Sequence, residues 1–470
     1  MNTRILAVDT PSHLNKSVTL KGWVHVRRDM GKIIFVHLRD RSGQVQVVFV
    51  PGECPDYKLA KTLRDEFVVN ITGQVVARTA KNVNPKIPTG TVEIQARQLI
   101  ILSQAATPPF PLDQTRAITE EARLKYRYLD LRSARMQHNI RTRHHVIKFI
   151  RDWLDGQGFV EIETPYITKG TPEGAREFIV PSRQHPGKFY TLPQSPQQFK
   201  QLLMVGGMER YFQIARCFRD EDQRGDRQPE FTQLDLEMSF VEEADVLQLT
   251  EELFTALIKK LFPDKHITQS PFPRISYTEA MKKWGTDKPD IRQNKKDDNE
   301  LGFCFIVDFP LLEYSATEKK LVPVHHLFTA PKDEDLSLLD SDPAKVKAKQ
   351  YDFVCNGFEI AGGSIRIHDQ ELQRKIFRLL KLSEAEIDSR FGHMLTAFSH
   401  GVPPHGGIAP GLDRIVMILC QEPNIREVIA FPKTGDGRDL MMGAPSELPP
   451  SALREAHIQI KPTTKKRSPV

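Results

Sequence analysis

Arginine and acidic side chains are concentrated in one stretch of the chain, Phe218–Phe240, which reads FRDEDQRGDRQPEFTQLDLEMSF. Arg219, Arg224 and Arg227 lie among many carboxylates there. A guanidinium group can bind phosphate through two parallel hydrogen bonds, whereas carboxylates suit an ammonium group or a metal ion. The residue types therefore predict contacts with a ligand of this kind. The alternative is a solvated, salt-bridged surface hairpin.

The segments on either side of this loop alternate with the period of two that is typical of β-strands. Before the loop, residues 211–219 place every second side chain on one face; after it, Leu234 and Leu236 alternate with Asp235 and Glu237. The glycine and proline between the two segments mark a long loop. We therefore expect a hairpin with one polar face and an arginine-rich tip.

Polar residues of two other stretches could complete such a site. The sequence LPQSPQQFKQLLM permits a helix that starts near Ser195, which would put Gln197 and Lys200 on adjacent turns. The sequence NGFEIAGGSIRIHD reads as a strand in which Glu359 and Arg366 flank a glycine pair, where a backbone can approach closely. Each stretch taken alone also has a packing explanation.

Three further stretches carry residues that could bind a ligand. PPHGGIAPGLDRIVMIL predicts a glycine-rich strand and an apolar helix that begins near Gly411–Arg414, and the start of a helix favours anions. The loop TKGTPEGAREF carries Glu173. VHHLFTAPKDED contains the adjacent His325 and His326, which point in different directions on most backbones and do not predict a metal site.

Composition limits the class of protein. A chain of 470 residues predicts two or three domains, and 39% hydrophobic with 27% charged residues is typical of a soluble globular protein. The net charge of +6 permits a polyanionic partner without requiring one. Five cysteines without paired spacing argue against a disulfide framework or zinc site. No stretch reads as a signal peptide or a membrane span, so we expect a cytoplasmic protein without membrane contact.

Residues 1–105 predict a five-stranded OB-fold β-barrel. Strand-like segments cover 18–28, 33–40, 44–50, 67–77 and 91–102, with a short helix at 56–63 between the third and fourth. Phe35 and Gln46 lie on the second and third strands, with several arginines nearby. An aromatic ring can stack on a base and an amide can bind a base edge, so we expect a nucleic-acid surface. A core position for Phe35 is the alternative.

The remaining chain predicts an α+β domain. A proline cluster marks a linker over residues 106–122, and a second domain is expected at 123–460. Helical spacing occurs at 140–154 and 244–262, whereas 281–301 is polar and predicted to be mostly loop. The basic segment 461–470 is expected to be a flexible tail.

The order of these stretches resembles the three signature motifs of the class II aminoacyl-tRNA synthetases, and within them the bacterial type of aspartyl-tRNA synthetase. The similar stretches include GWVHVRRDMG, FVHLRDRSGQVQVVF, FVEIETPYITKGTPEGAREF, LPQSPQQFKQLLM, the stretch 218–240, HHLFTAPKDEDL, GGSIRIHD, HGGIAPGLDRIVM and IREVIAFPKT. They cover almost the whole chain. The resemblance implies an OB-fold anticodon-binding domain and a catalytic domain with an antiparallel sheet flanked by helices.

The resemblance also implies a role for each candidate residue. Arg219 and Arg414 would be catalytic. The aspartate site would consist of Glu173, Gln197, Lys200, Arg219, Asp235, His325 and Arg366. The ATP site would consist of Arg219, Asp220, Glu221, Gln228, Glu359, Gly411, Leu412, Asp413 and Arg414, with Glu359 also binding Mg²⁺. The anticodon would be bound by Arg28, Phe35, Gln46 and Glu93.

The implied reaction has two steps. L-aspartate attacks the α-phosphate of ATP to form aspartyl-adenylate, and the aspartyl group then moves to the 3′ end of tRNA-Asp, with tRNA-Asn as a second possible acceptor. A homodimer is also implied. Lys200 and Arg366 would favour a carboxylate over an amide, because we expect asparagine to leave both buried positive charges unpaired.

This sequence departs from the family in one large feature. Bacterial-type enzymes carry an inserted domain between the second and third motifs, but here GTDKPDIR runs almost directly into FCFIVDFP, so 281–301 is predicted to be its remnant. A smaller departure is Pro410, where the family more often has another residue; a proline near a helix start is tolerable.

Three alternatives stay open at this point. An asparaginyl- or lysyl-tRNA synthetase of the same subclass is the nearest. A non-catalytic RNA-binding paralogue should have lost Arg219, Glu359 or Arg414, and all three are present. An ATP-dependent asparagine synthetase would not need the N-terminal barrel.

Overall fold

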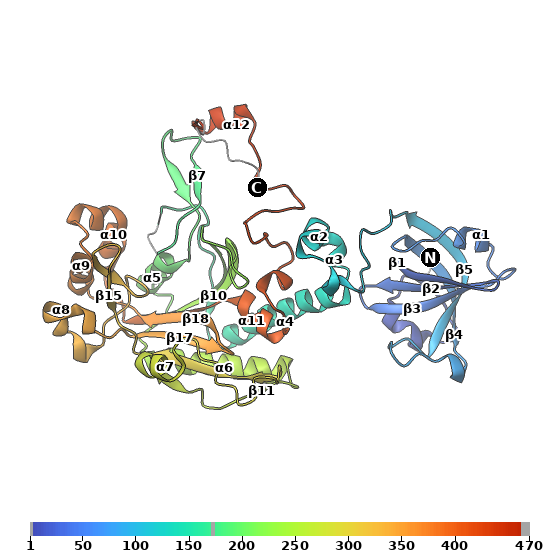
Figure 1. The fold of residues 1–470 in the computed structure, drawn as a ribbon, viewed down its shortest axis with the longest axis horizontal. Helices are drawn as coiled ribbons and strands as arrows, with labels where there is room; N and C mark the ends of the chain where they lie inside the picture. Colours follow the sequence, from blue (N-terminus) through green and yellow to red (C-terminus); the bar gives the residue numbers. More distant parts are fainter. Residues whose placement is uncertain (1–2, 171–173, 462–470) are drawn as a thin grey trace. The chain divides into compact units, whose positions relative to one another are not determined.

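The chain forms two compact units, Met1–Ile118 and Thr119–Val470, and each is described by itself. The computed structural model describes residues 3–170 and 174–461 (Figure 1). None of the helices in these ranges is long and apolar enough to cross a membrane.

The N-terminal unit is a closed five-stranded barrel with the strand order β1-β2-β3-β5-β4, as predicted for an OB-fold. Its strands are β1 (Ser17–Met30), β2 (Ile33–Asp40), β3 (Gly43–Phe49), β4 (Val68–Ala77) and β5 (Val92–Ser103), with helix α1 (Tyr57–Ala60) between β3 and β4. Alternate residues of β2, such as Ile34 and Val36, fill the barrel core. Phe35 and His37 therefore point outward, so the alternative core position for Phe35 is excluded.

The second unit is built on an eight-stranded sheet in the order β12-β14-β17-β18-β19-β10-β9-β6. These strands are β6 (Val160–Glu161), β9 (Arg210–Phe218), β10 (Glu230–Ser239), β12 (Arg274–Ser276), β14 (Phe303–Val307), β17 (Gln350–Cys355), β18 (Phe358–Ile365) and β19 (His405–Pro410). The inner six are antiparallel, as predicted, but both edge strands run parallel to their neighbours. Parallel pairing needs a crossover, and a helix lies in each of these connections.

Helices cover this sheet and bury its apolar side chains. The main ones are α4 (Ala134–Gly156), α5 (Gln197–Val205), α6 (Glu243–Leu261), α7 (Tyr277–Trp284) and α11 (Leu412–Leu419). Helix α4 packs against α6 and α11, and α11 packs against β10 (Figure 1). Val146, Phe254 and Val416 of these helices are buried in one core with the sheet.

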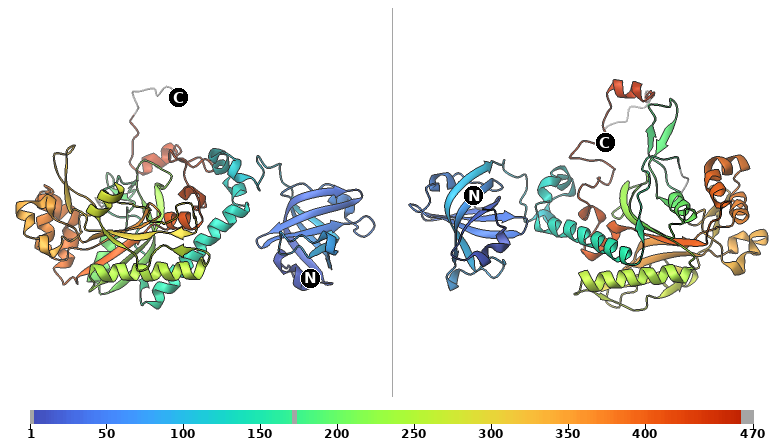
Figure 2. Two further views of the ribbon diagram at one scale, coloured as in Figure 1. Left: turned by 60° about the horizontal axis from the view of Figure 1, so that its bottom comes forward. Right: turned by 180° about the vertical axis from the view of Figure 1, so that it is seen from behind.

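Helices α9 (Gln370–Leu379) and α10 (Glu384–Phe398) lie side by side (Figure 2). Between them the rings of Phe377 and Phe391 stack with their centroids 4.5 Å apart. The remaining helices are α2 (Glu120–Lys125), α3 (Arg127–Asp130), α8 (Leu338–Ser341) and α12 (Pro450–Glu455). Small two-stranded sheets in the described ranges pair β7 (Ile179–Pro181) with β8 (Phe189–Thr191), β11 (His266–Ile267) with β13 (Glu300–Leu301), and β15 (Leu312–Ser315) with β16 (Lys320–Pro323).

Two expected boundaries differ from the structure. The linker expected at 106–122 ends earlier, because α2 begins at Glu120 after Thr119, whose Oγ1 accepts the backbone N–H of Ala122 at 3.5 Å. Thr119 followed by two glutamates is an N-cap signal with an acidic first turn. The polar segment 281–301 includes the end of α7 and strand β13. Most of the tail expected at 461–470 lies outside the described residues.

Candidate active site

A cavity of about 370 Å³ lies over the centre of the large sheet. Strands β10, β18 and β19, the starts of α5 and α11, and the loop between β9 and β10 contribute to its lining. Most of the predicted catalytic-domain site residues line it: Gln197, Lys200, Arg219, Glu221, Gln228, Asp235, His325, Glu359, Arg366, Gly411, Asp413 and Arg414. The fold therefore gathers residues that are up to 217 positions apart in the sequence.

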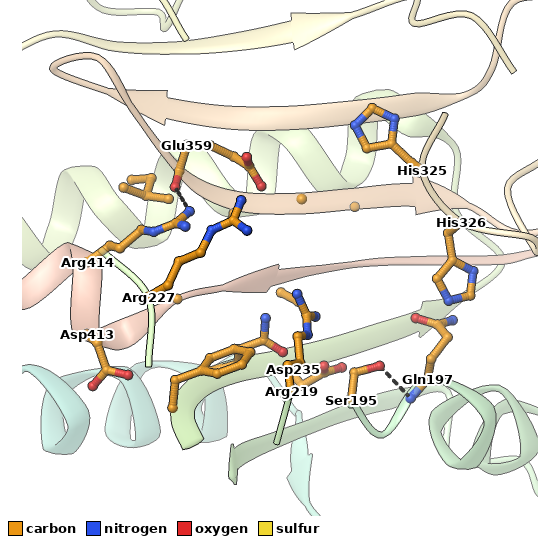
Figure 3. A pocket seen from close by; sticks show the side chains of 18 of the residues that line it. Ser195, Gln197, Arg219, Arg227, Asp235, His325, His326, Glu359, Asp413 and Arg414 are labelled. Carbon is orange, nitrogen blue, oxygen red and sulfur yellow. Dashed lines mark hydrogen bonds between the residues drawn. The ribbon is translucent and has the colours of Figure 1, made fainter. Parts of the chain in front are cut away.

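The labelled side chains fall into two groups along this cavity (Figure 3). Glu359, Arg227 and Arg414 lie toward one end, whereas Ser195, Gln197 and His326 lie toward the other, with Arg219 and Asp235 between them. The site thus has two ends with different chemistry.

Four buried charges form the floor of the cavity, and we call Lys200, Asp235, Glu237 and Arg366 the buried quartet. The Lys200 ammonium lies 2.6 Å from Oδ1 of Asp235 and 3.1 Å from Oε2 of Glu237. Arg366 donates from Nε to Oε1 of Glu237 at 2.9 Å and from Nη2 to Oε2 at 3.2 Å. All four residues are at most 4% exposed, so these charges interact in a medium that screens them weakly.

The two carboxylates of the quartet have different protonation behaviour. Burial alone would raise the pKa of Glu237, but Arg366 and Lys200 lower it to about 2. Burial raises the pKa of Asp235, and Lys200 offsets this rise only in part. Among the described residues, neither oxygen of Asp235 has a well-aligned hydrogen-bond partner, although Lys200 lies close. Asp235 therefore has acceptor capacity left for a cationic ligand group.

Glycines allow the quartet to pack against the sheet. A Cβ atom at Gly407 would lie 2.3 Å from Oε2 of Glu237, and one at Gly363 would lie 2.5 Å from the Tyr351 ring. Only glycine leaves space at these two positions, which explains the second glycine of each pair in β18 and β19.

Arg219 is the first residue after β9 and is held at the base of the loop, where its backbone N–H donates to Pro229 at 2.8 Å. Its guanidinium lies over the Phe231 ring, 5.1 Å from the centroid, in a cation–π contact. Within the described part of the chain, Nε of Arg219 has no hydrogen-bond partner. The group is therefore oriented by stacking while it keeps donors for a ligand.

The opposite end of the cavity is formed around Arg414 in the first turn of α11. Nη1 of Arg414 donates to the backbone carbonyl of Glu359 at 2.7 Å, and Nη2 lies 3.1 Å from Oδ2 of Asp226. The Glu359 carboxylate is 3.0 Å from the ammonium of Lys288. Asp352 is buried near Glu359, and burial together with the Glu359 charge raises its pKa. This end thus combines two cations with three carboxylates.

The two adjacent histidines have different surroundings. Burial, with Arg366 and Lys200 nearby, holds the pKa of His326 well below its usual value, so its ring is neutral. Nδ1 of His326 accepts the backbone N–H of Phe328 at 3.2 Å, which places the ring proton on Nε2. Burial alone would lower the pKa of His325, but Asp352, 3.5 Å away, raises it.

Several predicted residues also stabilise the site internally. Gln228 exchanges two hydrogen bonds with the backbone of Lys433, at 2.7 and 3.1 Å. Asp413 accepts the backbone N–H of Thr232 at 2.8 Å and pairs with Arg143 of α4. Glu221 lies 3.4 Å from Arg227.

Three predicted residues are not placed in the cavity. Asp220 is exposed and its backbone N–H donates to Arg176 at 3.0 Å, whereas Leu412 is buried in the core. Neither residue lines the cavity. Glu173 lies outside the described residues.

The structure adds residues that the sequence reasoning did not assign to the site. Glu237 shares the polar face of β10 with Asp235, and this alternation was the signal for it. Glu237 lies beneath the cavity against Lys200 and Arg366, whereas Phe231 and His326 line it. Asp352 stands alone in the apolar strand β17, where a buried charge without an obvious partner is a signal of function.

The four residues expected to bind an anticodon lie on the outer surface of the barrel. Arg28 of β1 is directly opposite Phe35 of β2 in the strand register. Nε2 of Gln46 donates to Oε2 of Glu93 at 2.8 Å, and the same oxygen lies 3.4 Å from Nε of Arg78. An aromatic ring thus lies on the same barrel as an amide–carboxylate–arginine network.

Comparisons with known proteins agree with this division. Residues 119–435 match a family described as class II tRNA synthetases (D, K and N), and residues 18–102 match an OB-fold nucleic acid binding domain. The aspartate–tRNA(Asp/Asn) ligase of Rubrobacter xylanophilus is 43% identical and covers 97% of each chain. The ligase of the same name from Thermoanaerobacter pseudethanolicus is 43% identical over 96% of this chain and 97% of its own.

The alignment with the Rubrobacter protein runs over 582 positions, more than the 470 residues of this chain. The relative therefore carries residues that this chain lacks, in agreement with the expected loss of an insertion.

Solved structures share the fold. Asparaginyl-tRNA synthetase from Pyrococcus horikoshii, in complex with asparaginyl-adenylate, is 23% identical with a TM-score of 0.75 over 92% of this chain and 99% of its own. Aspartyl-tRNA synthetase from Entamoeba histolytica is 24% identical with a TM-score of 0.72 over 92% of this chain and 91% of its own. At this identity the likeness concerns the fold alone.

Proposed function

Because this chain belongs to the class II tRNA synthetases (D, K and N), we propose that it is an aspartate–tRNA ligase, which activates L-aspartate with ATP and transfers the aspartyl group to tRNA-Asp. The observation that carries the choice of amino acid is the buried quartet at the floor of the cavity. The name of the relatives extends the proposal to tRNA-Asn as a second acceptor.

The quartet leaves two donors for a substrate carboxylate. Nη1 of Arg366 donates one of its two hydrogens to Oγ of Ser364 at 2.5 Å, and Glu237 and the Gly407 carbonyl occupy Nε and Nη2. Two of the three N–H groups of the Lys200 ammonium are directed toward Asp235 and Glu237. One N–H of each cation remains, and a carboxylate with two acceptor oxygens can accept both.

This geometry corrects the expectation that asparagine would leave both cations unpaired. Arg366 and Lys200 already have carboxylate partners within the protein. Asparagine is instead disfavoured because its amide N–H₂ would face one of the two remaining donors. A lysine substrate would bring a third cation beside Lys200 and Arg366.

The α-ammonium of aspartate would bind to Asp235, whose oxygens have unused acceptor capacity. Gln197 lies at the end of the cavity opposite Arg414 (Figure 3). Nε2–H of the neutral His326 supplies a further donor at this end. These contacts would leave the α-carboxylate as the nucleophile that faces the nucleotide.

The nucleotide would bind between Arg219 and Arg414. Phe231 would offer a ring for the adenine, and Arg219, held over that ring, would contact both the α-phosphate and the α-carboxylate. In the first step a carboxylate oxygen attacks the α-phosphorus and pyrophosphate leaves. In the second, the terminal ribose hydroxyl of the tRNA attacks the acyl carbon and AMP leaves. Alignment and charge neutralisation would supply most of the rate.

Mg²⁺ would enter with ATP and be held by Glu359 with Asp352 beside it, where it would neutralise phosphate charge. The two carboxylates fit that role, because the charge of Glu359 raises the pKa of Asp352 and a shared cation would relieve the repulsion. Within residues 3–170 and 174–461 no group of three His, Cys, Asp or Glu residues is arranged to hold a metal.

The barrel would bind the anticodon through the face that carries Arg28, Phe35, Gln46 and Glu93. Phe35 would stack on a base, and Gln46 and Glu93, which share a hydrogen bond, would contact base edges. Charging of tRNA would take place in the cytoplasm.

A homodimer is part of the proposal. Large apolar side chains are exposed between the end of α4 and β8: Val160, Tyr166, Ile167, Ile179, Phe189 and Tyr190. A second copy of the chain is a suitable cover for such a surface. Sedimentation of an active dimer would support this, and a stable active monomer would contradict it.

The test of the proposed function is amino-acid-dependent exchange between ATP and labelled pyrophosphate. Aspartate alone, from a panel with asparagine and lysine, should support exchange. Aminoacylation of purified tRNA-Asp and tRNA-Asn in parallel would then define the acceptors. Exchange with asparagine or lysine instead, or with none of the three, would refute the proposal.

A further inference from the structure

The short polar segment between α7 and β13, Gly285–Asn299, reaches the phosphate end of the cavity. Its residue Lys288 lies beside Glu359, with an ammonium-to-carboxylate distance of 3.0 Å. Arg414 is also close enough to Lys288 and Glu359 to influence the pKa of both. The segment predicted to be only the remnant of an insertion thus contributes a cation to this end.

The segment does not need this ion pair to keep its conformation. Arg292 binds Asp290 through two hydrogen bonds of 2.8 and 3.0 Å. The Glu300 carboxylate accepts the backbone N–H groups of Gln293 and Asn294, each at 2.8 Å. A tether between Lys288 and Glu359 adds little to these contacts, so a purely structural role explains the position of Lys288 poorly.

The surroundings of the pair allow it to exchange partners. The side chains of Lys288 and Glu359 are 37% and 32% exposed, and an ion pair of this exposure is held weakly. Glu359 is also the carboxylate to which the proposed function assigns Mg²⁺. When Mg²⁺ binds Glu359, the ammonium of Lys288 loses its partner and becomes available at the end of the cavity that Arg414 lines.

We propose that Lys288 is a phosphate-binding residue of the ATP site, which holds Glu359 in the free protein and binds the terminal phosphates of ATP in the nucleotide complex. The inference rests on the proposed function. The β- and γ-phosphates carry more negative charge than one carboxylate, so they compete well for the ammonium. During activation Lys288 would then stabilise the charge of the departing pyrophosphate.

The test compares the affinities of ATP and AMP, because only ATP has the terminal phosphates. Equilibrium dialysis with Mg²⁺ and without amino acid measures both without turnover. Lys288→Met should weaken ATP binding about tenfold and leave AMP binding unchanged. Lys288→Arg keeps the positive charge and should retain most of the affinity for ATP. The control is Lys296→Met, which removes an exposed lysine of the same segment.

A measurement on the unaltered protein makes the test independent of variant folding. Acetic anhydride labelling, followed by mass spectrometry, should show that ATP with Mg²⁺ protects Lys288 and that AMP does not. Equal loss of ATP and AMP affinity in Lys288→Met, or equal protection by both nucleotides, would overturn the inference. If the unaltered protein still shows aspartate-dependent exchange, such a result refutes only the role of Lys288 and leaves the proposed function intact.

Discussion

Arg366, the residue directly after β18, and Glu237 of β10 form an ion pair with two hydrogen bonds beneath the cavity, with donor–acceptor distances of 2.9 and 3.2 Å. The pair fixes the plane of the guanidinium before any substrate binds. Glu237 also neutralises the charge of Arg366 within the protein. The remaining N–H of Arg366 is therefore oriented by the ion pair before a substrate binds. Glu237 is therefore a positioning residue for substrate recognition.

Replacement of Glu237 by glutamine tests this positioning role. Glutamine keeps the volume but offers one acceptor and one donor, so Arg366 loses a hydrogen bond and its charge partner. We expect the free energy of unfolding to fall by about 3 kcal/mol, as for a broken buried pair, and the KM for aspartate to rise at least about tenfold. Urea unfolding and aspartate-dependent exchange would measure the two effects.

The KM for ATP in the same assay serves as the internal control. It should stay within about twofold of the unaltered value, because Glu237 lies away from Arg414 and Glu359. Equal increases in both KM values would mean that the substitution disturbs the whole site.

The pH dependence of stability provides an independent test of Glu237. Its pKa of about 2 in the folded protein lies below the ordinary value of 4.5, so its ionised form stabilises the fold above about pH 4.5. This contribution should be lost as the pH falls from 4.5 toward 2. The unfolding free energy of Glu237→Gln should fall less steeply in that range. Asp235 is present in both proteins, and the Glu237 charge is a smaller cause of its raised pKa than burial, so most of the Asp235 contribution cancels from the comparison. Parallel curves would contradict the ion pair.

The hairpin around residues 218–240 shows how much the sequence could predict. Strict alternation fixed both strands and put Asp235 on the polar face, and β9 and β10 confirm it. The sequence could not tell whether that face meets water or the interior. The answer depends on Lys200 of α5 and on Arg366, which directly follows β18. Both pack against the acidic side chains of β10 and bury them.

Contacts between distant segments account for most of what sequence reasoning missed. Lys288 reaches Glu359 only because the segment after α7 passes beside Gly357, in the turn that precedes β18. The role of Asp413 in holding β10 and α4 together likewise depends on Thr232 and Arg143, far away in the chain. Local periodicity carries no information on such pairs, whereas the barrel was predictable because its strands are regular and joined by recognisable turns.

Replacement of Arg366 by leucine should abolish aspartate-dependent ATP–pyrophosphate exchange, because it removes a substrate donor and leaves Glu237 without its main partner. Arg378→Leu on α9 is a matched control, since Arg378 is 55% exposed and pairs only with Glu384 among the described ion pairs. Exchange near the normal rate in Arg366→Leu would contradict the aspartate site. A circular dichroism spectrum and a thermal melt would separate loss of binding from loss of fold.

Replacement of Phe35 by alanine should separate the two reaction steps. The ring points outward from β2 opposite Arg28, so its loss removes a stacking surface without opening the barrel core. Stacking of one base on an aromatic ring contributes about 1–3 kcal/mol, so the KM for tRNA should rise about tenfold or more. Aspartate-dependent exchange should be unchanged, because activation needs no tRNA. Val8→Ala in the 3₁₀-helix Ala7–His13 removes an exposed apolar side chain from the same unit and should leave both activities intact. Equal loss of exchange and charging in Phe35→Ala would mean that the barrel contributes to the fold or the catalytic site and not to anticodon binding.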